Sequence, residues 1–193
     1  ASDVYKRQVS GNAINGTANN VSLTTDRAGN ANSAYYFSSI NSYIELPYSN
    51  LYNFAPSGSF TISVWVLPDQ GYSWPAQAVV VKSPPHPNYL ASQWNYGTYL
   101  LNYKAMGGFG GNHILNGTTT LTSTQCWYNI VQTYNNGRWN MYINGILESS
   151  DLTQTRFILQ DAFSKIVYGK KGESDGDYYK GKIDDVRIYN RVV

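Results

Sequence analysis

Short segments in which apolar and polar residues alternate recur along this chain, bounded by Gly, Asn, Pro and Asp. No stretch long enough to form a helix shows the 3.6-residue period of an amphipathic helix. The clearest segment is residues 60–67. One set of alternating positions holds Phe60, Ile62, Val64 and Val66, and the other holds Thr61, Ser63, Trp65 and Leu67. Successive side chains of a strand point to opposite faces, so the two sets are expected on opposite faces of a sheet. The alternation predicts an all-β chain.

Nine segments of this kind are predicted to be strands. They are residues 34–37, 43–46, 60–67, 78–82, 98–103, 127–134, 139–143, 165–169 and 181–189. Asn136-Gly137 and Asn144-Gly145 are predicted as tight turns, because Asn and Gly accept the positive φ that such turns require. Residues 127–149 should therefore form a three-stranded meander. Residues 10–33 are expected as an edge loop, and residues 83–97 as a long irregular loop.

The amino-acid composition favours strands and argues against some classes of function. Hydrophobic residues make up 42% of the chain, which is enough for a core, and 18 Tyr and 5 Trp favour a pleated, half-buried surface. The net charge is only +2 and the basic residues are scattered, which argues against a nucleic-acid interface. No apolar run reaches the roughly 20 residues of a membrane helix. Cys126 is the only cysteine, so it cannot form an intrachain disulfide, and we expect it to be buried in a strand.

Several segments, taken in order, carry a resemblance to a known family. They are residues 25–37, 42–46, 60–66 (FTISVWV), 127–131 with 141–145 (MYING), and 181–190 (GKIDDVRIYN). This series resembles the laminin G-like domains of bacterial surface proteins, over about residues 11–191. The resemblance implies a concanavalin A-like jelly roll, which is an antiparallel β-sandwich of the superfamily that includes the pentraxin-like lectins.

The same resemblance exposes two departures from the family pattern. Residues 1–9 stand where a first strand is usual, and we interpret them as a leader or a sequence-assembly remnant. Residues 10–193 are then a single domain. Phe37-Ser38-Ser39 stands where the family often has Phe-Asp-Gly, so one side-chain ligand sometimes offered there is missing.

Glucanases share this sandwich, so catalysis has to be considered. Retaining glycosidases need two carboxyl groups about 5–5.5 Å apart, and the glucanases of this fold carry them in a Glu-x-Asp-x-Glu pattern. Of the three glutamates, only Glu173 begins a similar run, and that run lacks the second Glu and lies in a predicted loop. The sequence therefore predicts no catalytic residues. A polysaccharide lyase that uses His113 and a tyrosine stays open as an alternative, as does a hydrolase.

The resemblance implies a structural calcium ion. Calcium takes six to eight oxygen ligands from carboxylates, amides and carbonyls. In similar sandwiches an acidic residue at the start of the last strand meets the N-terminal loop, which suggests Asp184 with Asp26 and Asn30 as metal ligands. The alternative is that Asp184 or Asp185 pairs with Arg187 or caps a turn.

An acidic loop and several aromatic residues are the candidates for ligand binding. Glu173, Asp175 and Asp177 repel one another, a cost that a cation would remove, and their position is similar to the calcium loop of pentraxins. Alternatively they form an acidic hairpin tip beside three lysines. Sugar recognition needs flat aromatic faces with polar groups beside them. The aromatic residues expected in loops are Trp74, Trp94, Tyr96 and Tyr72, whereas Trp65 and Trp139 lie in predicted strands and are expected to pack.

Taken together, these observations predict a non-catalytic carbohydrate-binding, lectin-like module of a larger exported or cell-surface protein. Its partner would be a glycan or polysaccharide, with calcium either structural, ligand-binding or absent. The alternative from another class is a protein–protein adhesion or spacer domain. Burial of the loop aromatics against the sheet would favour that alternative.

Overall fold

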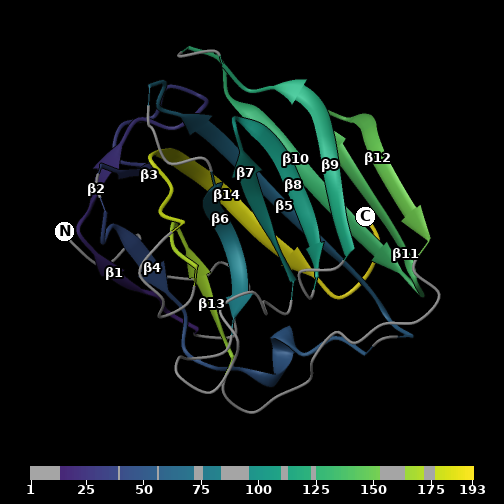
Figure 1. Ribbon diagram of the computed structural model, residues 1–193. Helices are drawn as coiled ribbons and strands as arrows, with labels where there is room; N and C mark the ends of the chain where they lie inside the picture. Colours follow the sequence, from purple (N-terminus) through teal and green to yellow (C-terminus); the bar gives the residue numbers. More distant parts are fainter. Residues whose placement is uncertain are drawn as a thin grey trace.

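A computed structural model gives the fold as two stacked seven-stranded sheets (Figure 1). It describes residues 14–38, 40–55, 57–71, 76–83, 96–109, 113–122, 125–152, 164–171 and 177–193. The β6 sheet has the order β1 (Thr17–Asn19), β4 (Tyr43–Glu45), β13 (Lys165–Tyr168), β6 (Ala76–Ser83), β7 (Tyr96–Leu101), β8 (Lys104–Phe109) and β9 (His113–Thr120). The β5 sheet has the order β12 (Ile146–Leu152), β11 (Arg138–Ile143), β10 (Tyr128–Asn135), β5 (Ser59–Pro68), β14 (Gly181–Tyr189), β3 (Ala34–Phe37) and β2 (Val21–Thr24).

The predicted antiparallel sandwich is confirmed. Each of the nine predicted strands is present, and those at 34–37 and 181–189 have the predicted bounds. The meander is β10–β11–β12, and its first turn has positive φ at Asn136 (42°) and Gly137 (92°). The one described helical element is a short 3-10 turn, η2 (Asn50–Tyr52).

Three expectations are wrong. Residues 10–33 are not simply a loop, because β1 and β2 lie within them and pair with β4 and β3. Strands β8 and β9 were not predicted at all, and β7 begins inside the expected loop 83–97. Cys126 is exposed just before β10 rather than buried in a strand.

The core lies between the sheets and contains a cluster of aromatic rings. Phe60 from β5 stacks on Phe54 with ring centroids 4.5 Å apart and meets Trp139 from β11 edge-on at 5.2 Å. Tyr96 from β7 and Tyr134 from β10 complete the cluster. The predicted inner face of β5 is confirmed, because Phe60, Ile62, Val64 and Val66 have no exposed surface.

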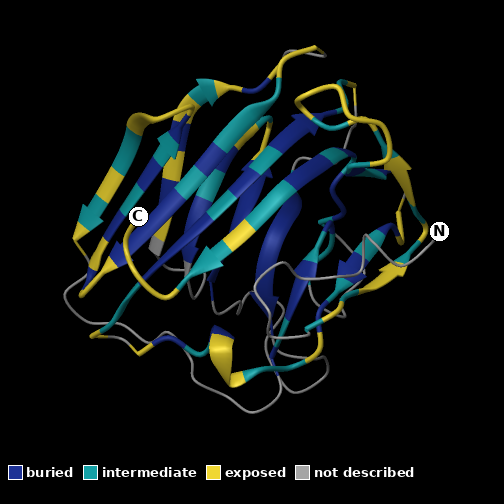
Figure 2. Ribbon diagram, turned by 180° about the vertical axis from the view of Figure 1, so that it is seen from behind, coloured by how far each residue is buried: buried dark blue, intermediate teal, exposed yellow. Residues whose placement is uncertain are grey.

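The outer faces of the two sheets differ. On the β6 sheet, Ala78, Val81 and Tyr99 point away from the core and yet are buried in a cluster of their own. On the β5 sheet, Ser63 and Trp65 point outward and are half-buried, whereas the outward Thr61 is buried. Figure 2 looks onto this face, where exposed and half-buried residues alternate with buried ones along the strands. The outer face of the β5 sheet is called here the β5-sheet face.

The edges of the two sheets meet at Glu148, whose carboxylate joins β12 to β9. It accepts hydrogen bonds from the amide and hydroxyl of Thr118 (2.7 and 2.5 Å) and from those of Thr119 (3.0 and 2.6 Å). These bonds, led by the Thr118 hydroxyl, lower the pKa of Glu148 from 4.5 to about 2. The charged carboxylate therefore stabilises the closed edge of the sandwich.

We expect Glu148→Gln to lower the free energy of unfolding by about 1–2 kcal/mol at neutral pH, less than the pKa shift alone implies because solvent screens a partly exposed group. A depressed pKa in the folded state gives stability that is present above the unfolded value of 4.5 and is lost as the pH falls towards about 2. Urea unfolding over that pH range should show the difference between wild type and variant shrinking with acid. A difference that does not change with pH would contradict this role. Glu45→Gln, which removes a surface ion pair with Lys165, is the control and should cost less.

Candidate functional site

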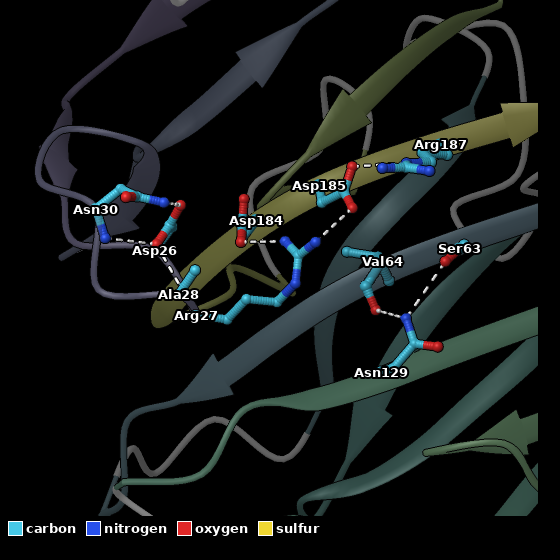
Figure 3. Close-up of polar contacts among 10 residues, drawn as sticks. All are labelled: Asp26, Arg27, Ala28, Asn30, Ser63, Val64, Asn129, Asp184, Asp185 and Arg187. Atoms are coloured by element: carbon cyan, nitrogen blue, oxygen red, sulfur yellow. Dashed lines mark hydrogen bonds and ion pairs between the residues drawn. The ribbon is translucent and has the colours of Figure 1, made fainter.

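A row of three unlike side chains crosses the centre of the β5-sheet face. Asp184 in β14 pairs directly with Trp65 in β5, and Trp65 pairs with Asn129 in β10. Residues directly opposite each other in neighbouring strands project to the same face. The register therefore places a carboxylate, an indole and an amide side by side, with Asn129 donating to the Ser63 hydroxyl at 3.3 Å (Figure 3).

Arg27, from the loop between β2 and β3, contacts two members of this row, Trp65 and Asp184. Its guanidinium carbon lies 5.0 Å from the centre of the Trp65 ring, in cation–π contact. The same guanidinium donates to Asp184 at 2.5 Å and to Asp185 at 2.9 Å. The second oxygen of Asp185 accepts from Arg187 at 2.7 Å, which raises the pKa of Arg187. Two carboxylates and two guanidinium groups thus alternate along the start of β14 (Figure 3).

An irregularity in β14 explains why two successive acidic residues can both reach Arg27. The pairing of β14 with β5 shifts register between Asp184 and Arg187, and Asp185 has a positive φ of 46°. A bulge of this kind re-aims the side chains next to it. In a regular strand Asp184 and Asp185 would point to opposite faces.

The loop that presents Arg27 is held by its own hydrogen bonds. One oxygen of Asp26 accepts from the amides of Ala28 and Asn30, both at 2.8 Å, and the other accepts from the Asn30 side chain at 3.0 Å. The Asn30 side-chain bond is the largest of the effects that lower the pKa of Asp26. Both oxygens of this carboxylate therefore bind the loop itself.

The residues expected to bind calcium come together only in part. The loop with Asp26 and Asn30 does lie beside β14, but Asp184 forms an ion pair with the Arg27 guanidinium (Figure 3). Asp26 and Asn30 bind each other, and in the part of the chain that the structure describes no three acidic, His or Cys side chains converge on one point. Arg27 thus provides a positive charge beside Asp184, and the calcium site stays a prediction. The alternative in which Asp185 pairs with Arg187 is seen.

Most of the residues expected to bind a ligand lie outside the described residues: Trp74, Trp94, Tyr72, Glu173 and Asp175. The expectation that Tyr96 is an exposed stacking platform is wrong. It begins β7, has no exposed surface, and its hydroxyl donates to the Tyr52 carbonyl at 2.9 Å. Asp177 lies 3.5 Å from Lys171, and its backbone carbonyl accepts from Ala78 at 2.7 Å. That ion pair agrees with the alternative of an acidic hairpin beside lysines.

Trp65 and Arg27 were missed as candidate site residues. The expectation that Trp139 packs in the core is confirmed, whereas Trp65 is half-buried on the opposite side of its sheet. The signal was present in residues 60–67, where the alternation already sets Trp65 against the apolar face of the strand. Arg27 has no comparable signal, because it contacts a residue 157 positions away.

Two stacked antiparallel sheets are the architecture of a concanavalin A-like jelly roll. A family model described as the concanavalin A-like lectin/glucanases superfamily, of laminin G type, matches residues 37–193. The chain therefore belongs to this family, as its motifs suggested. No curated protein sequence is similar enough to count as a match.

Solved structures share the fold at low sequence identity. The binding domain of Paraclostridial Mosquitocidal Protein 1 is 20% identical with a TM-score of 0.72, over 97% of this chain and 46% of that one. The ligand-binding domain of botulinum neurotoxin serotype D, in complex with N-acetylneuraminic acid, is 18% identical (TM-score 0.66; 96% and 44%). A Trypanosoma rangeli sialidase in complex with 2,3-difluorosialic acid is 13% identical (0.67; 94% and 28%). The chain spans less than half of each of these proteins, so the likeness is one of fold.

Within the described residues, no helix has the length and apolar character needed to cross a bilayer.

Proposed function

We propose that this chain is a non-catalytic carbohydrate-binding module of a larger exported or cell-surface protein, and that it binds glycan on the β5-sheet face. The observation that carries the proposal is the row of Asp184, Trp65 and Asn129, together with Arg27, which contacts Trp65 and Asp184. Sugar rings stack their apolar faces on aromatic side chains, while carboxylate, amide and guanidinium groups bind the hydroxyls. The row offers all four groups on a rigid sheet.

The relatives support a binding role in general terms. The family carries lectins in its description, and the neighbouring structures include two named binding domains, one of them holding a sialic acid. The loop residues Trp74, Trp94, Tyr72, Glu173 and Asp175 stay predictions for further ligand contacts. A cell-surface or secreted location also stays a prediction.

The absence of catalysis is proposed from the state of the carboxylates on this face. Glycoside hydrolysis needs two carboxyl groups that flank one bond, one of them as a proton donor. Asp184 and Asp185 instead form ion pairs with Arg27 and Arg187. Such pairs suit the binding of hydroxyl groups.

The test is a glycan-array screen of the wild-type chain and of Trp65→Ala. We expect the wild type to bind and Trp65→Ala to lose at least tenfold in affinity, because truncating a central aromatic contact costs more than about 1.4 kcal/mol. Trp65→Phe, which keeps a flat ring, is the matched control and should retain most of the binding. An array silent for the wild type, or equal binding by Trp65→Ala, would reject the proposal.

Calcium is tested by running the screen with calcium and with a chelator, and by measuring the melting temperature of the wild-type chain in the same two buffers. An ion bound only by the folded state raises the melting temperature by mass action. A metal at Asp184, Asp26 and Asn30 thus predicts a lower melting temperature after chelation, whereas the Arg27 ion pairs predict no change. An unchanged melting temperature would rule out Asp184 as a calcium ligand.

A protein–protein adhesion role is supported by a different surface. On the edge strand β12, Ile146, Leu147 and Leu152 are 69%, 54% and 58% exposed. Exposed apolar residues along an unpaired edge suit a protein partner. Binding to a protein that Leu147→Lys abolishes and Trp65→Ala leaves intact would favour this alternative.

A further inference from the structure

Three aromatic side chains lie on a straight diagonal across the β5-sheet face. Tyr36 in β3 pairs with Lys182, which pairs with Leu67 of β5. Tyr142 in β11 pairs with Val131, which pairs with Ser63 of β5. Relative to Trp65, Tyr36 is therefore two strands to one side and two residues along β5, and Tyr142 is two strands to the other side and two residues back.

The spacing along this diagonal is regular. Strands lie about 4.8 Å apart and rise about 3.4 Å per residue, which places the α-carbons of neighbouring members about 12 Å apart and the outer two about 24 Å apart. Two pyranose units of an extended polysaccharide cover about the distance between neighbouring members of the diagonal. The three rings can therefore contact alternate sugars of one chain. All three residues are half-buried, so each keeps some surface in contact with solvent.

Polar groups fill the gaps between the rings. Lys182 and Asp184 lie between Tyr36 and Trp65, as their pairing with Leu67 and Trp65 places them. Asn129 lies between Trp65 and Tyr142, with its amide on the Ser63 hydroxyl. Hydroxyls of the sugars that fall between the rings would meet these groups.

Two of the three rings, those of Tyr36 and Trp65, are also held in place before any ligand arrives. The Tyr36 hydroxyl donates to Asp69 at 2.8 Å, and that bond is the main cause of the raised pKa of Tyr36. Arg27 lies over Trp65 while bound to Asp184. Side chains already ordered in the free protein lose less entropy on binding.

We propose that the ligand of this face is an extended, unbranched polysaccharide that lies along Tyr36, Trp65 and Tyr142. This inference rests on the proposed carbohydrate-binding function and narrows it, because a single terminal sugar would contact only one ring. Affinity should therefore grow with the length of the chain.

The experiment measures affinity for β-1,4-linked gluco-, xylo- and chito-oligosaccharides and for oligogalacturonates, each from two to six units, by isothermal titration calorimetry. In the series that binds, we expect at least a tenfold gain from the shortest to the longest oligomer. Tyr36→Ala and Tyr142→Ala should each lower affinity for the longest oligomer about tenfold and leave that for the shortest unchanged. Tyr189→Ala is the matched control: Tyr189 is a half-buried tyrosine on the same face but off the diagonal, level with Thr61, and its loss should change nothing. Equal melting temperatures of the three variants exclude unfolding as the cause.

Two outcomes would overturn the extended ligand and leave the proposed function standing. One is equal affinity for short and long oligomers, or no effect of Tyr36→Ala and Tyr142→Ala on the longest. The other is array binding to terminal sugars together with silence on all four series. A wild-type chain that binds no glycan in either assay rejects the proposed function itself, and this inference with it.

Discussion

Replacement of Trp139 by alanine is expected to lower the free energy of unfolding by about 4 kcal/mol, the largest loss we predict for a single side chain. Trp139 is 1% exposed and packs against Phe60 at 5.2 Å and Tyr134 at 5.1 Å between ring centroids. Its removal leaves a cavity between two sheets whose strands are fixed by their hydrogen bonds, so the surroundings can collapse only in part. Urea unfolding followed by circular dichroism measures the loss.

Trp65→Ala is the matched control for this core substitution. Both tryptophans lie on strands of the β5 sheet, but Trp65 is on the outer face and half-buried. We expect it to cost about 1 kcal/mol, chiefly from the lost contact with Arg27. The two variants should therefore separate stability from binding: Trp139→Ala loses stability, and Trp65→Ala loses glycan affinity. Similar losses of stability would contradict the assignment of the two residues to opposite faces.

The strands of the core could be predicted because burial on one face leaves a period of two in the sequence. Residues 60–67 show the pattern in full, and every second side chain in them is indeed without exposed surface. Turns with Asn-Gly were equally readable, since positive φ at Asn136 and Gly137 limits which residues can stand there. Both signals are local.

Strands at the edges of the sheets carry a weaker signal. β1 and β2 bury little, so they need no apolar alternation and resemble loops in composition. β8 contains Gly107 and Gly108, which are poor strand formers. Gly107 is required by packing from the opposite sheet, because a Cβ there would lie 2.1 Å from the buried Gln132 side chain. Tertiary contact thus outweighs local propensity.

The candidate site could be predicted only in its acidic half. Asp184 could be predicted because family motifs place a carboxylate at the start of the last strand. The prediction that it lies beside the loop that contains Asp26 is correct. The cation beside it is Arg27, whose role depends on a contact made across 157 residues and on the irregularity at Asp185. Neither the long-range contact nor the irregularity can be predicted from the spacing of residues that are close in the sequence.

Replacement of Gly169 by alanine is expected to lower the free energy of unfolding by about 3 kcal/mol, whereas the same change at Gly145 should cost only about 1 kcal/mol. Both glycines have a φ of +81°, so both variants bear the same backbone penalty. Only at Gly169 would the new methyl group clash, 2.4 Å from the Phe37 ring and 3.0 Å from the Ser42 carbonyl, while nothing lies within 4 Å at Gly145. Gly169 also links β6 to the segment before β14, since its amide donates to the Val79 carbonyl and its own carbonyl accepts from the Tyr179 amide, each at 3.0 Å. Equal losses in urea unfolding would show that Phe37 does not pack against Gly169.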